Sequence, residues 1–217
     1  MELFAHPFSS YCQKALIALY EHEVPFRFRL LTPMDPATLE ARRALWPLAK
    51  MPVLHDGNRV LVEASIIVEY VDQKHDGAQR LVPVDPVRAL EVRMLDRVFD
   101  NYVMTPVQKI VGDRLRRDDA VRDPHGVTEA RALLQASYRW LDTRIAGHEW
   151  IAGGFSLADC AAAPSLFYAE WVEPIPADCA ALRAYRARLL ARPSMARCVE
   201  EAREFRPFFP GGAPDQD

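Results

Sequence analysis

The feature that most constrains the fold is a change of pattern part-way along the chain. Up to about residue 78, short alternating hydrophobic runs take turns with segments of helical spacing, and beyond a stretch punctuated by prolines almost every segment has helical spacing. At roughly 100–200 residues per domain, a chain of 217 residues holds one large domain or two small ones. The pattern favours two, and we predict an α/β domain, a linker, an all-helical domain and a loosely held tail over residues 1–78, 79–87, 88–205 and 206–217.

The composition excludes several classes of protein. Hydrophobic residues make up 50% of the chain and charged residues 26%, which is typical of a globular protein rather than a disordered one. A net charge of −3 gives no basic footprint for nucleic acid. No run approaches the ~18 apolar residues of a membrane-spanning helix, and the N-terminus lacks the features of a signal peptide. We therefore expect a cytoplasmic protein without nucleic-acid or membrane partners.

The cysteines give no sign of a metal site or a disulfide framework. The chain has four, widely scattered and without a Cys-x-x-Cys pair: Cys12, Cys160, Cys179 and Cys198. We interpret them as small buried hydrophobic residues in a reducing compartment, and we expect no metal.

The first part of the chain is predicted to fold in the order βαβαββα. Alternation predicts strands over residues 2–6, 26–30, 52–55 and 59–62, and helical spacing predicts helices over residues 10–22, 35–45 and 64–74. Pro7 ends the first strand, and Asp56-Gly57-Asn58 is typical of a hairpin turn between the last two strands.

In the second part, prolines and caps mark the helices. Thr105-Pro106 interrupts the first long helix, and a proline inside a helix bends it. Ser156-Leu157-Ala158-Asp159 is a capping-box variant at the start of a strongly apolar helix, so we expect Asp159 to serve the fold rather than the chemistry. Pro36 and Pro193 occupy the favoured first position of two further helices.

The order of elements and several motifs together resemble the cytosolic glutathione transferases. The motifs are Ser9-Ser10-Tyr11-Cys12-Gln13-Lys14 at the first strand-to-helix junction, Met51-Pro52 before the third strand, Pro52 to Gly57, Leu61 to Ile67 with Tyr70, and Gly154 to Asp159. The resemblance covers essentially the whole chain and is to serine-type, theta- or zeta-like bacterial members. It implies a thioredoxin-like glutathione-binding domain followed by a helical bundle, glutathione as cosubstrate, a small electrophile as second substrate, and a homodimer.

The serines at the first junction are the candidate catalytic residues. The N-terminus of a helix favours negative charge, so a thiolate placed there is stabilised, and a serine hydroxyl can donate a hydrogen bond to it. In glutaredoxin-like relatives the first of these positions is the nucleophilic cysteine, which Ser9 replaces here, with Cys12 left at the resolving position. Ser10 competes with Ser9 for the role, both serines also suit simple helix capping, and an exposed Cys12 would permit thiol–disulfide exchange.

By resemblance, Met51-Pro52 carries the family's cis-proline. In that geometry the backbone of Met51 would pair with the cysteinyl part of glutathione as an added strand does. The alternative is a trans-proline that merely starts a strand. Lys50, the preceding residue, is a candidate partner for the glycyl carboxylate of the ligand.

The segment Glu63-Ala64-Ser65 is the candidate site for the γ-glutamyl end of glutathione. Glu63 can receive the α-ammonium, while N–H groups at the helix start face the carboxylate, although a carboxylate here also suits a helix start alone. The family usually has serine where this chain has Ala64. Loss of this hydroxyl costs about 0.5–1.5 kcal/mol of glutathione binding free energy if nothing replaces it. Either Ser65 compensates, or glutathione binding is weak.

The helical half is expected to supply the pocket for the electrophile. By resemblance this pocket lies between the kinked helix pair and the first junction, which makes the following residues its candidate walls: Phe8, Tyr102, Met104, Gln108, Arg114 and Trp171. The alternative is that an aromatic and methionine stripe at helical spacing is plain core.

The sequence therefore favours a glutathione transferase that conjugates the glutathione thiolate to small electrophiles. Three alternatives stay open: a glutathione-dependent isomerase of the maleylacetoacetate type, a thiol–disulfide reductase, and a non-catalytic binding module of the same fold. Ala64 is the main motive for the last of these.

Overall fold

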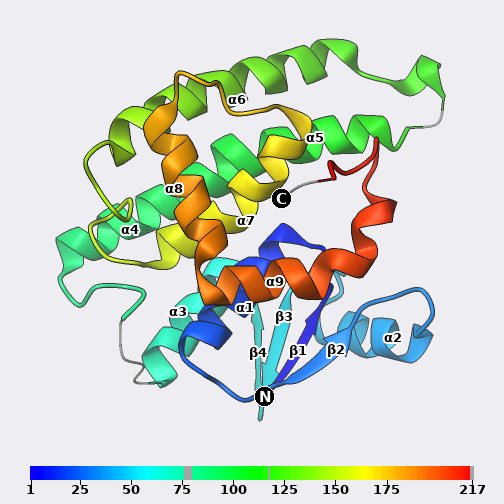
Figure 1. Ribbon diagram of the computed structural model, residues 1–217. Coiled ribbons are helices and arrows are strands. Elements are labelled where there is room, and N and C mark those ends of the chain that lie inside the picture. The colour runs from blue at the N-terminus through cyan, green and yellow to red at the C-terminus, as the bar shows by residue number, and fades with distance from the viewer. Residues whose placement is uncertain (76–79, 117, 216–217) are drawn as a thin grey trace.

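The computed structural model describes residues 1–75, 80–116 and 118–215. Figure 1 shows a four-stranded sheet with its helices, and a larger group of helices stacked on one side of it. An α/β domain followed by an all-helical one is thus confirmed. The predicted boundary between them, at residues 78 and 79, lies outside the described residues.

The N-terminal domain has the predicted order βαβαββα. Its elements are β1 (Glu2–Ala5), α1 (Ser10–Glu21), β2 (Arg27–Leu30), α2 (Pro36–Leu45), β3 (Val53–Asp56), β4 (Arg59–Val62) and α3 (Ala64–Lys74). The strands lie in the order β2-β1-β3-β4, with β1 and β2 parallel and the other pairs antiparallel. The strand β2 is therefore an edge strand.

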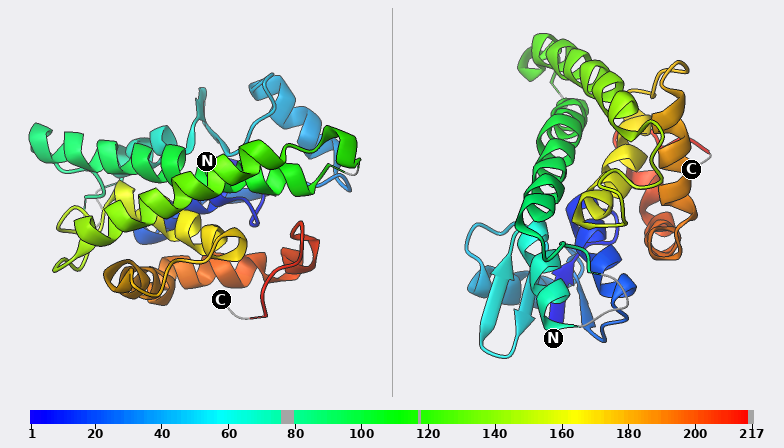
Figure 2. Two further views of the ribbon diagram at one scale, coloured as in Figure 1. Left: turned by 90° about the horizontal axis from the view of Figure 1, so that it is seen from above. Right: turned by 90° about the vertical axis from the view of Figure 1, so that its left-hand side faces the viewer.

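Helices cover both faces of this sheet because its strands alternate side chains between the faces. Leu3 and Ala5 join the large core that contains α1 and α3, whereas Phe4 joins a smaller cluster with Val53 and the residues around α2. The right-hand view of Figure 2 shows the sheet between α2 and the pair α1 and α3.

The C-terminal domain is built around one buried helix. Its helices are α4 (Pro86–Val98), α5 (Thr105–Arg114), α6 (Pro124–Ile145), α7 (Leu157–Val172), α8 (Ala180–Ala191) and α9 (Pro193–Ala202), with 3₁₀ segments at Asp119–Val121 and Arg203–Phe208. The helix α7 is buried along almost its whole length and packs against α1, α4 and α8. It therefore joins the two domains into one core.

A π-helical segment, Phe99–Met104, separates α4 from α5. Its cause is Pro106, which lacks an N–H and leaves the carbonyl of Tyr102, four residues earlier, without its helical donor. That carbonyl accepts a hydrogen bond from Ser137 Oγ at 3.0 Å instead. The predicted interruption of the first long helix is confirmed.

The predicted capping box at the start of α7 is also confirmed. The Asp159 carboxylate accepts hydrogen bonds from Ser156 N and Ser156 Oγ, each at 2.9 Å, and from Tyr185 Oη at 2.6 Å. It also accepts one from Ile151 N at 3.3 Å. This fully buried carboxylate has four donors, and its role is to hold the start of α7.

The structure differs from the sequence prediction at both ends of the helical domain. Asp85 caps α4, which begins at Pro86, so the helix starts inside the predicted linker. The tail was expected to be loosely held, but Phe209 is buried and its ring lies 4.9 Å from that of Trp171. The segment lacks periodicity, which explains the prediction, yet one aromatic side chain that fits a cluster is enough to dock it.

Candidate functional site

The register of the sheet brings three loops to one end of it. Val53 pairs with Phe4 of β1 on one side and with Val62 of β4 on the other. The turn after β1, the segment before β3 and the start of α3 therefore lie at the same end of the strands. These segments carry the serine pair, Met51-Pro52 and Glu63.

The turn between β1 and α1 is held by its own hydrogen bonds. Phe8 N donates to His6 Nδ1 at 3.1 Å, and Ser9 N donates to His6 O at 3.0 Å. Ser9 is the N-cap of α1, and its Oγ accepts from Cys12 N at 3.5 Å. Ser10 is the first helical residue and is buried, so only Ser9 has a half-exposed hydroxyl at the mouth of the helix.

Cys12 is unsuited to thiol–disulfide exchange. Its side chain is fully buried, and burial raises the pKa of the thiol to about 11. All four cysteines are free and buried, which confirms their interpretation as small hydrophobic residues. The thiolate, which is the reactive form, would be scarce at neutral pH even if Cys12 were accessible.

The peptide bond between Met51 and Pro52 is cis, as the resemblance implies. Pro52 is buried, while Met51 is 39% exposed and Lys50 is exposed. The buried Arg42 of α2 donates to the carbonyl of Ala49, which fixes the segment immediately before them. Met51 therefore lies just before the central strand β3, in a loop that Arg42 holds in place.

The start of α3 is strained and lacks a side-chain cap. Glu63, its N-cap residue, has φ of +69° and makes no capping hydrogen bond through its side chain. A positive φ at a residue other than glycine costs about 1–3 kcal/mol and is found at ligand clamps. The first N–H groups of a helix have no acceptor within it, and at the start of α3 the N-cap side chain supplies none either.

A buried charge cluster supports this helix start from behind. Lys14 of α1 forms ion pairs with Asp96 and with Asp100, the latter at 2.8 Å. Ser65 Oγ accepts from Lys14 Nζ at 2.9 Å and donates to Asp96 at 2.9 Å, and Arg97 also reaches it. The Ser65 hydroxyl is thus engaged inside the protein, which leaves only its backbone N–H for a ligand.

Sequence reasoning missed the acidic members of this cluster and also Tyr11. Burial and the nearby carboxylates raise the pKa of Tyr11 to about 12, so this half-buried phenol stays protonated beside the site. The available signal for the acids was their spacing, because Asp96 and Asp100 stand four residues apart inside an apolar helical stripe.

Aromatic rings gather behind the serine turn. The Phe8 ring lies 5.5 Å from Tyr168, 6.0 Å from Trp171 and 6.2 Å from Phe209. Phe8 and Trp171 were both predicted as pocket walls and do lie together, whereas Phe209 comes from the tail and was not predicted. Within the part of the chain that the structure describes, the buried Trp171 Nε1 has no hydrogen-bond acceptor.

The other predicted wall residues lie on the kinked helix pair. Met104 is buried in the main core, and Tyr102 and Gln108 are exposed. Arg114 donates to the carbonyl of Pro210 at 3.2 Å and so helps to hold the tail. The place of these side chains in a pocket with Phe8 stays a prediction.

Neither a metal site nor a membrane span is found in the described parts of the chain. Residues 1–75, 80–116 and 118–215 contain no group of three histidine, cysteine or acidic side chains arranged to hold a metal ion. Among the same residues, no helix has the length and apolar character needed to cross a bilayer.

The fold and site define a class of proteins in which a thioredoxin-like domain precedes an all-helical domain. Profiles of the N-terminal and C-terminal domains of glutathione S-transferases match residues 3–79 and 124–188. The chain belongs to the glutathione S-transferase family, whose members use glutathione as a cosubstrate.

Relatives and solved structures agree with this assignment over almost the whole chain. Glutathione S-transferase PARB of Nicotiana tabacum is 23% identical over 216 residues, covering 93% of this chain and 98% of its own. Stringent starvation protein A homolog of Haemophilus ducreyi is 28% identical over 206 residues, covering 92% and 89%. A glutathione S-transferase domain-containing protein of Marinobacter aquaeolei superposes with a TM-score of 0.80 at 25% identity, covering 90% and 100%. A theta-class enzyme of Xanthomonas axonopodis with glutathione bound has a TM-score of 0.77 at 24% identity, covering 91% and 96%.

Proposed function

We propose that this protein conjugates the thiolate of glutathione to small electrophiles. The proposal rests on one observation: Ser9, the cis Met51-Pro52 segment and the start of α3, which has no side-chain cap, all lie at the same end of the strands. A tripeptide with a central thiol, a carboxylate at each end and one α-ammonium group has a complementary partner at each of these places.

In this arrangement each part of glutathione has a partner. The backbone of Met51 pairs with the cysteinyl residue as an added strand, and Lys50 faces the glycyl carboxylate. The N–H groups of Ala64 and Ser65 receive the γ-glutamyl carboxylate, while the Glu63 carboxylate receives the α-ammonium. The thiol then lies at the N-terminus of α1, next to Ser9.

The chemistry needs a stabilised thiolate rather than a basic side chain. Loss of the thiol proton to solvent is favoured because the helix N-terminus and the Ser9 hydroxyl, as donor, stabilise the negative sulfur. The sulfur electron pair then forms a bond to an electrophilic carbon, and the leaving group departs with its own electron pair. The rings of Phe8 and Trp171 offer an apolar wall for that electrophile.

The same proposal includes a cytoplasmic homodimer. Val87, Leu90 and Met94 form an exposed apolar stripe on α4, and the exposed Ile66 lies on the adjoining α3. A bidentate ion pair between Arg93 and Glu69 joins these two helices, so the four side chains belong to one fixed surface. Light scattering should then give the mass of two chains.

A binding and activity experiment tests the main proposal. The protein should be retained on immobilised glutathione and should conjugate a chlorodinitrobenzene-type electrophile. Ser9→Ala should lower turnover by ~10–100-fold, because it removes one hydrogen bond to a charged atom, and should raise the pKa of the bound thiol in an ultraviolet titration. Ser10→Ala, at the buried neighbouring position, is the matched control and should leave that titration unchanged.

Other outcomes point to other roles. An unchanged titration in Ser9→Ala would remove Ser9 from the role. Retention without conjugation, or no retention at millimolar glutathione, would favour a non-catalytic binding module instead. Ala64 and the relatives named stringent starvation protein A homolog give that second candidate its specific support.

A further inference from the structure

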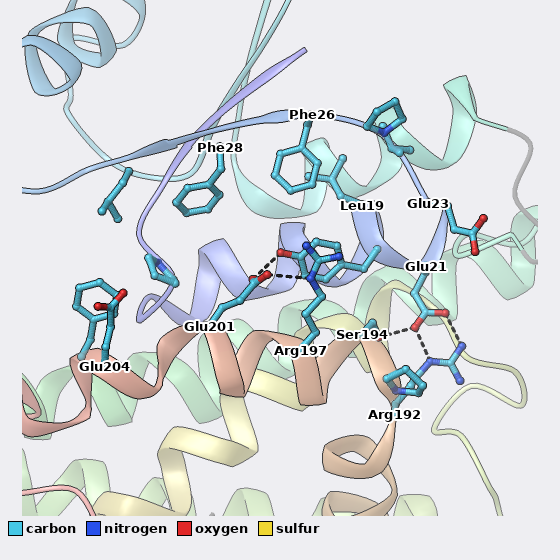
Figure 3. Close-up of a pocket in the computed structure, with 17 residues that line it drawn as sticks. Leu19, Glu21, Glu23, Phe26, Phe28, Arg192, Ser194, Arg197, Glu201 and Glu204 are labelled. Carbon is cyan, nitrogen blue, oxygen red and sulfur yellow. Dashed lines mark hydrogen bonds and ion pairs between the residues drawn. The ribbon is translucent and has the colours of Figure 1, made fainter.

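A large groove lies away from the candidate glutathione site. It has a volume of about 1140 Å³ and runs between β2 with the C-terminal half of α1 and the helix α9 (Figure 3). Binding pockets for small molecules commonly have volumes of about 300–1,000 Å³. The groove includes none of Ser9, Met51 and Glu63, so it is a second space with its own chemistry.

The floor of the groove is fixed by contacts between the two domains. Arg192 donates twice to Glu21, at 2.7 and 2.6 Å, and Tyr20 Oη donates to Glu201 at 2.6 Å. The Arg197 guanidinium lies 3.9 Å from the centre of the Tyr20 ring. Since these side chains are already held in place, a ligand would not have to order them, which lowers the cost of binding.

One wall of the groove is aromatic. Phe26, Phe28 and Leu30 alternate along the edge strand β2 and its approach, so their side chains share one face. Figure 3 shows Phe26 and Phe28 on one side of the groove, opposite Arg197, Glu201 and Glu204 on α9 and the segment that follows it. These aromatic rings are only half-buried, so an apolar body that covered them would gain hydrophobic free energy.

The charges of the groove are not balanced. Its lining contains four glutamates and two arginines. Both arginines are already paired within the groove, Arg192 with Glu21 and Arg197 with Glu201. Among the described residues that line the groove, Glu23 and Glu204 are then the surplus carboxylates, and both are exposed. Burial lowers the pKa of the nearby His6, so this imidazole does not neutralise Glu204 at neutral pH.

We infer that this groove binds amphipathic organic cations, molecules with a multi-ring apolar body and one positive charge. The apolar body lies on Phe26 and Phe28, while the charge lies toward Glu204 and the ring of Phe205. Aromatic faces and carboxylates both attract such a cation, whereas an anion of the same shape is repelled by the surplus carboxylates. The inference does not depend on the proposed function, because it uses different residues and a different ligand.

Two probes of equal shape and opposite charge test the inference. Calorimetry with the full chain, in saturating glutathione, compares tetraphenylphosphonium with tetraphenylborate. The phosphonium should bind about tenfold more tightly than the borate, and added salt should reduce the difference. Equal affinities, tighter binding of the borate, or no binding of the phosphonium would overturn the inference.

Variants locate the binding. Glu204→Gln, at an exposed position, should weaken phosphonium binding by ~2–5-fold without weakening that of borate. Glu200→Gln changes an exposed glutamate near the end of α9 that does not line the groove, and should leave both affinities unchanged. Phosphonium binding that is insensitive to Glu204→Gln, or that competes with glutathione, would contradict the assignment to this groove.

Discussion

Helices α3 and α7 begin in opposite ways. At the start of α7, Ser156 and Asp159 close the first turn, and the carboxylate is saturated by donors from Ile151 and Tyr185 as well. At the start of α3, Glu63 has a strained backbone, and its side chain makes no capping hydrogen bond. The first helix start is completed by side chains of the protein, whereas the second has no side-chain cap and is the place where we propose that the γ-glutamyl carboxylate binds.

The difference is one of capping, and under the proposed function the same physical element serves the fold in one domain and binding in the other. Unpaired N–H groups at a helix start are costly when buried and useful when an anion can reach them. A buried helix such as α7 therefore needs its capping box. The start of α3 lies at one end of the strands, and under the proposed function its strain is offset when glutathione binds there.

The start of α3 is nevertheless held in place, but by charges behind it rather than by a cap. Lys14 bridges α1 to Ser65 on α3 and to Asp96 and Asp100 on the helical domain. The cluster thus connects the start of α3 to α1 and to the helical domain. Variants of the two helix starts should separate support of the fold from binding of the ligand.

The largest effect is expected from Lys14→Met. It leaves two buried aspartates with Arg97 as their remaining cation, and breaking a buried ion pair in this way costs about 3–5 kcal/mol. Urea unfolding at neutral pH measures the loss. Lys109→Met, which removes an exposed lysine paired with Asp123, is the matched control and should change the free energy of unfolding far less. Equal losses in the two variants would show that the cluster is not a support of α3.

A loss of about 2–4 kcal/mol is expected from Asp159→Ala, because the donors of Ser156 and Tyr185 are left buried without an acceptor. The surviving folded protein should bind glutathione as the wild type does. Asp178→Ala, at an exposed aspartate of the same domain, should be nearly neutral in urea unfolding. A weakened glutathione affinity with unchanged stability would reverse the roles assigned to the two helix starts.

How far the sequence predicts these features depends on how local they are. The capping box spans Ser156 to Asp159, so its spacing alone predicts it, and the order of strands and helices follows from hydrophobic periodicity in the same way. The cis bond at Pro52 was predicted from the resemblance alone, and the positive φ of Glu63 was not predicted, since neither feature has a signature in composition.

Contacts between distant segments were beyond sequence reasoning. Lys14 and Asp100 are 86 residues apart, and no pattern indicates that they meet. Phe209 lies in a segment rich in glycine and proline, which predicted a loose tail, and only the folded core offers its ring a place. The alternating strand that forms the aromatic wall of the groove was predicted, and so was a helix that starts at Pro193. That this helix lies opposite the strand was not predicted.

Glu63→Gly tests the strain at the start of α3. Glycine adopts a positive φ without a steric cost, so the protein should gain about 1 kcal/mol in the free energy of unfolding while losing glutathione affinity with the carboxylate. Glu63→Gln is the matched control, because it removes the charge but keeps the backbone cost. Glu63→Gln should lose glutathione affinity without gaining stability. If both variants gained stability, the gain would come from removal of the charge rather than from relief of backbone strain.

The smallest effect is expected from Ala64→Ser, which adds one hydroxyl at the open helix start. If the start of α3 receives the γ-glutamyl carboxylate, the new donor should tighten glutathione binding by about 0.5–1.5 kcal/mol in calorimetry, with little change in stability. Ser65→Ala is the contrasting variant, since the Ser65 hydroxyl already serves Lys14 and Asp96. Its loss should lower stability and leave affinity nearly unchanged. Weaker or equal binding in Ala64→Ser would mean that the carboxylate lies elsewhere, and that the open turn of α3 differs from the closed turn of α7 for a reason other than this ligand.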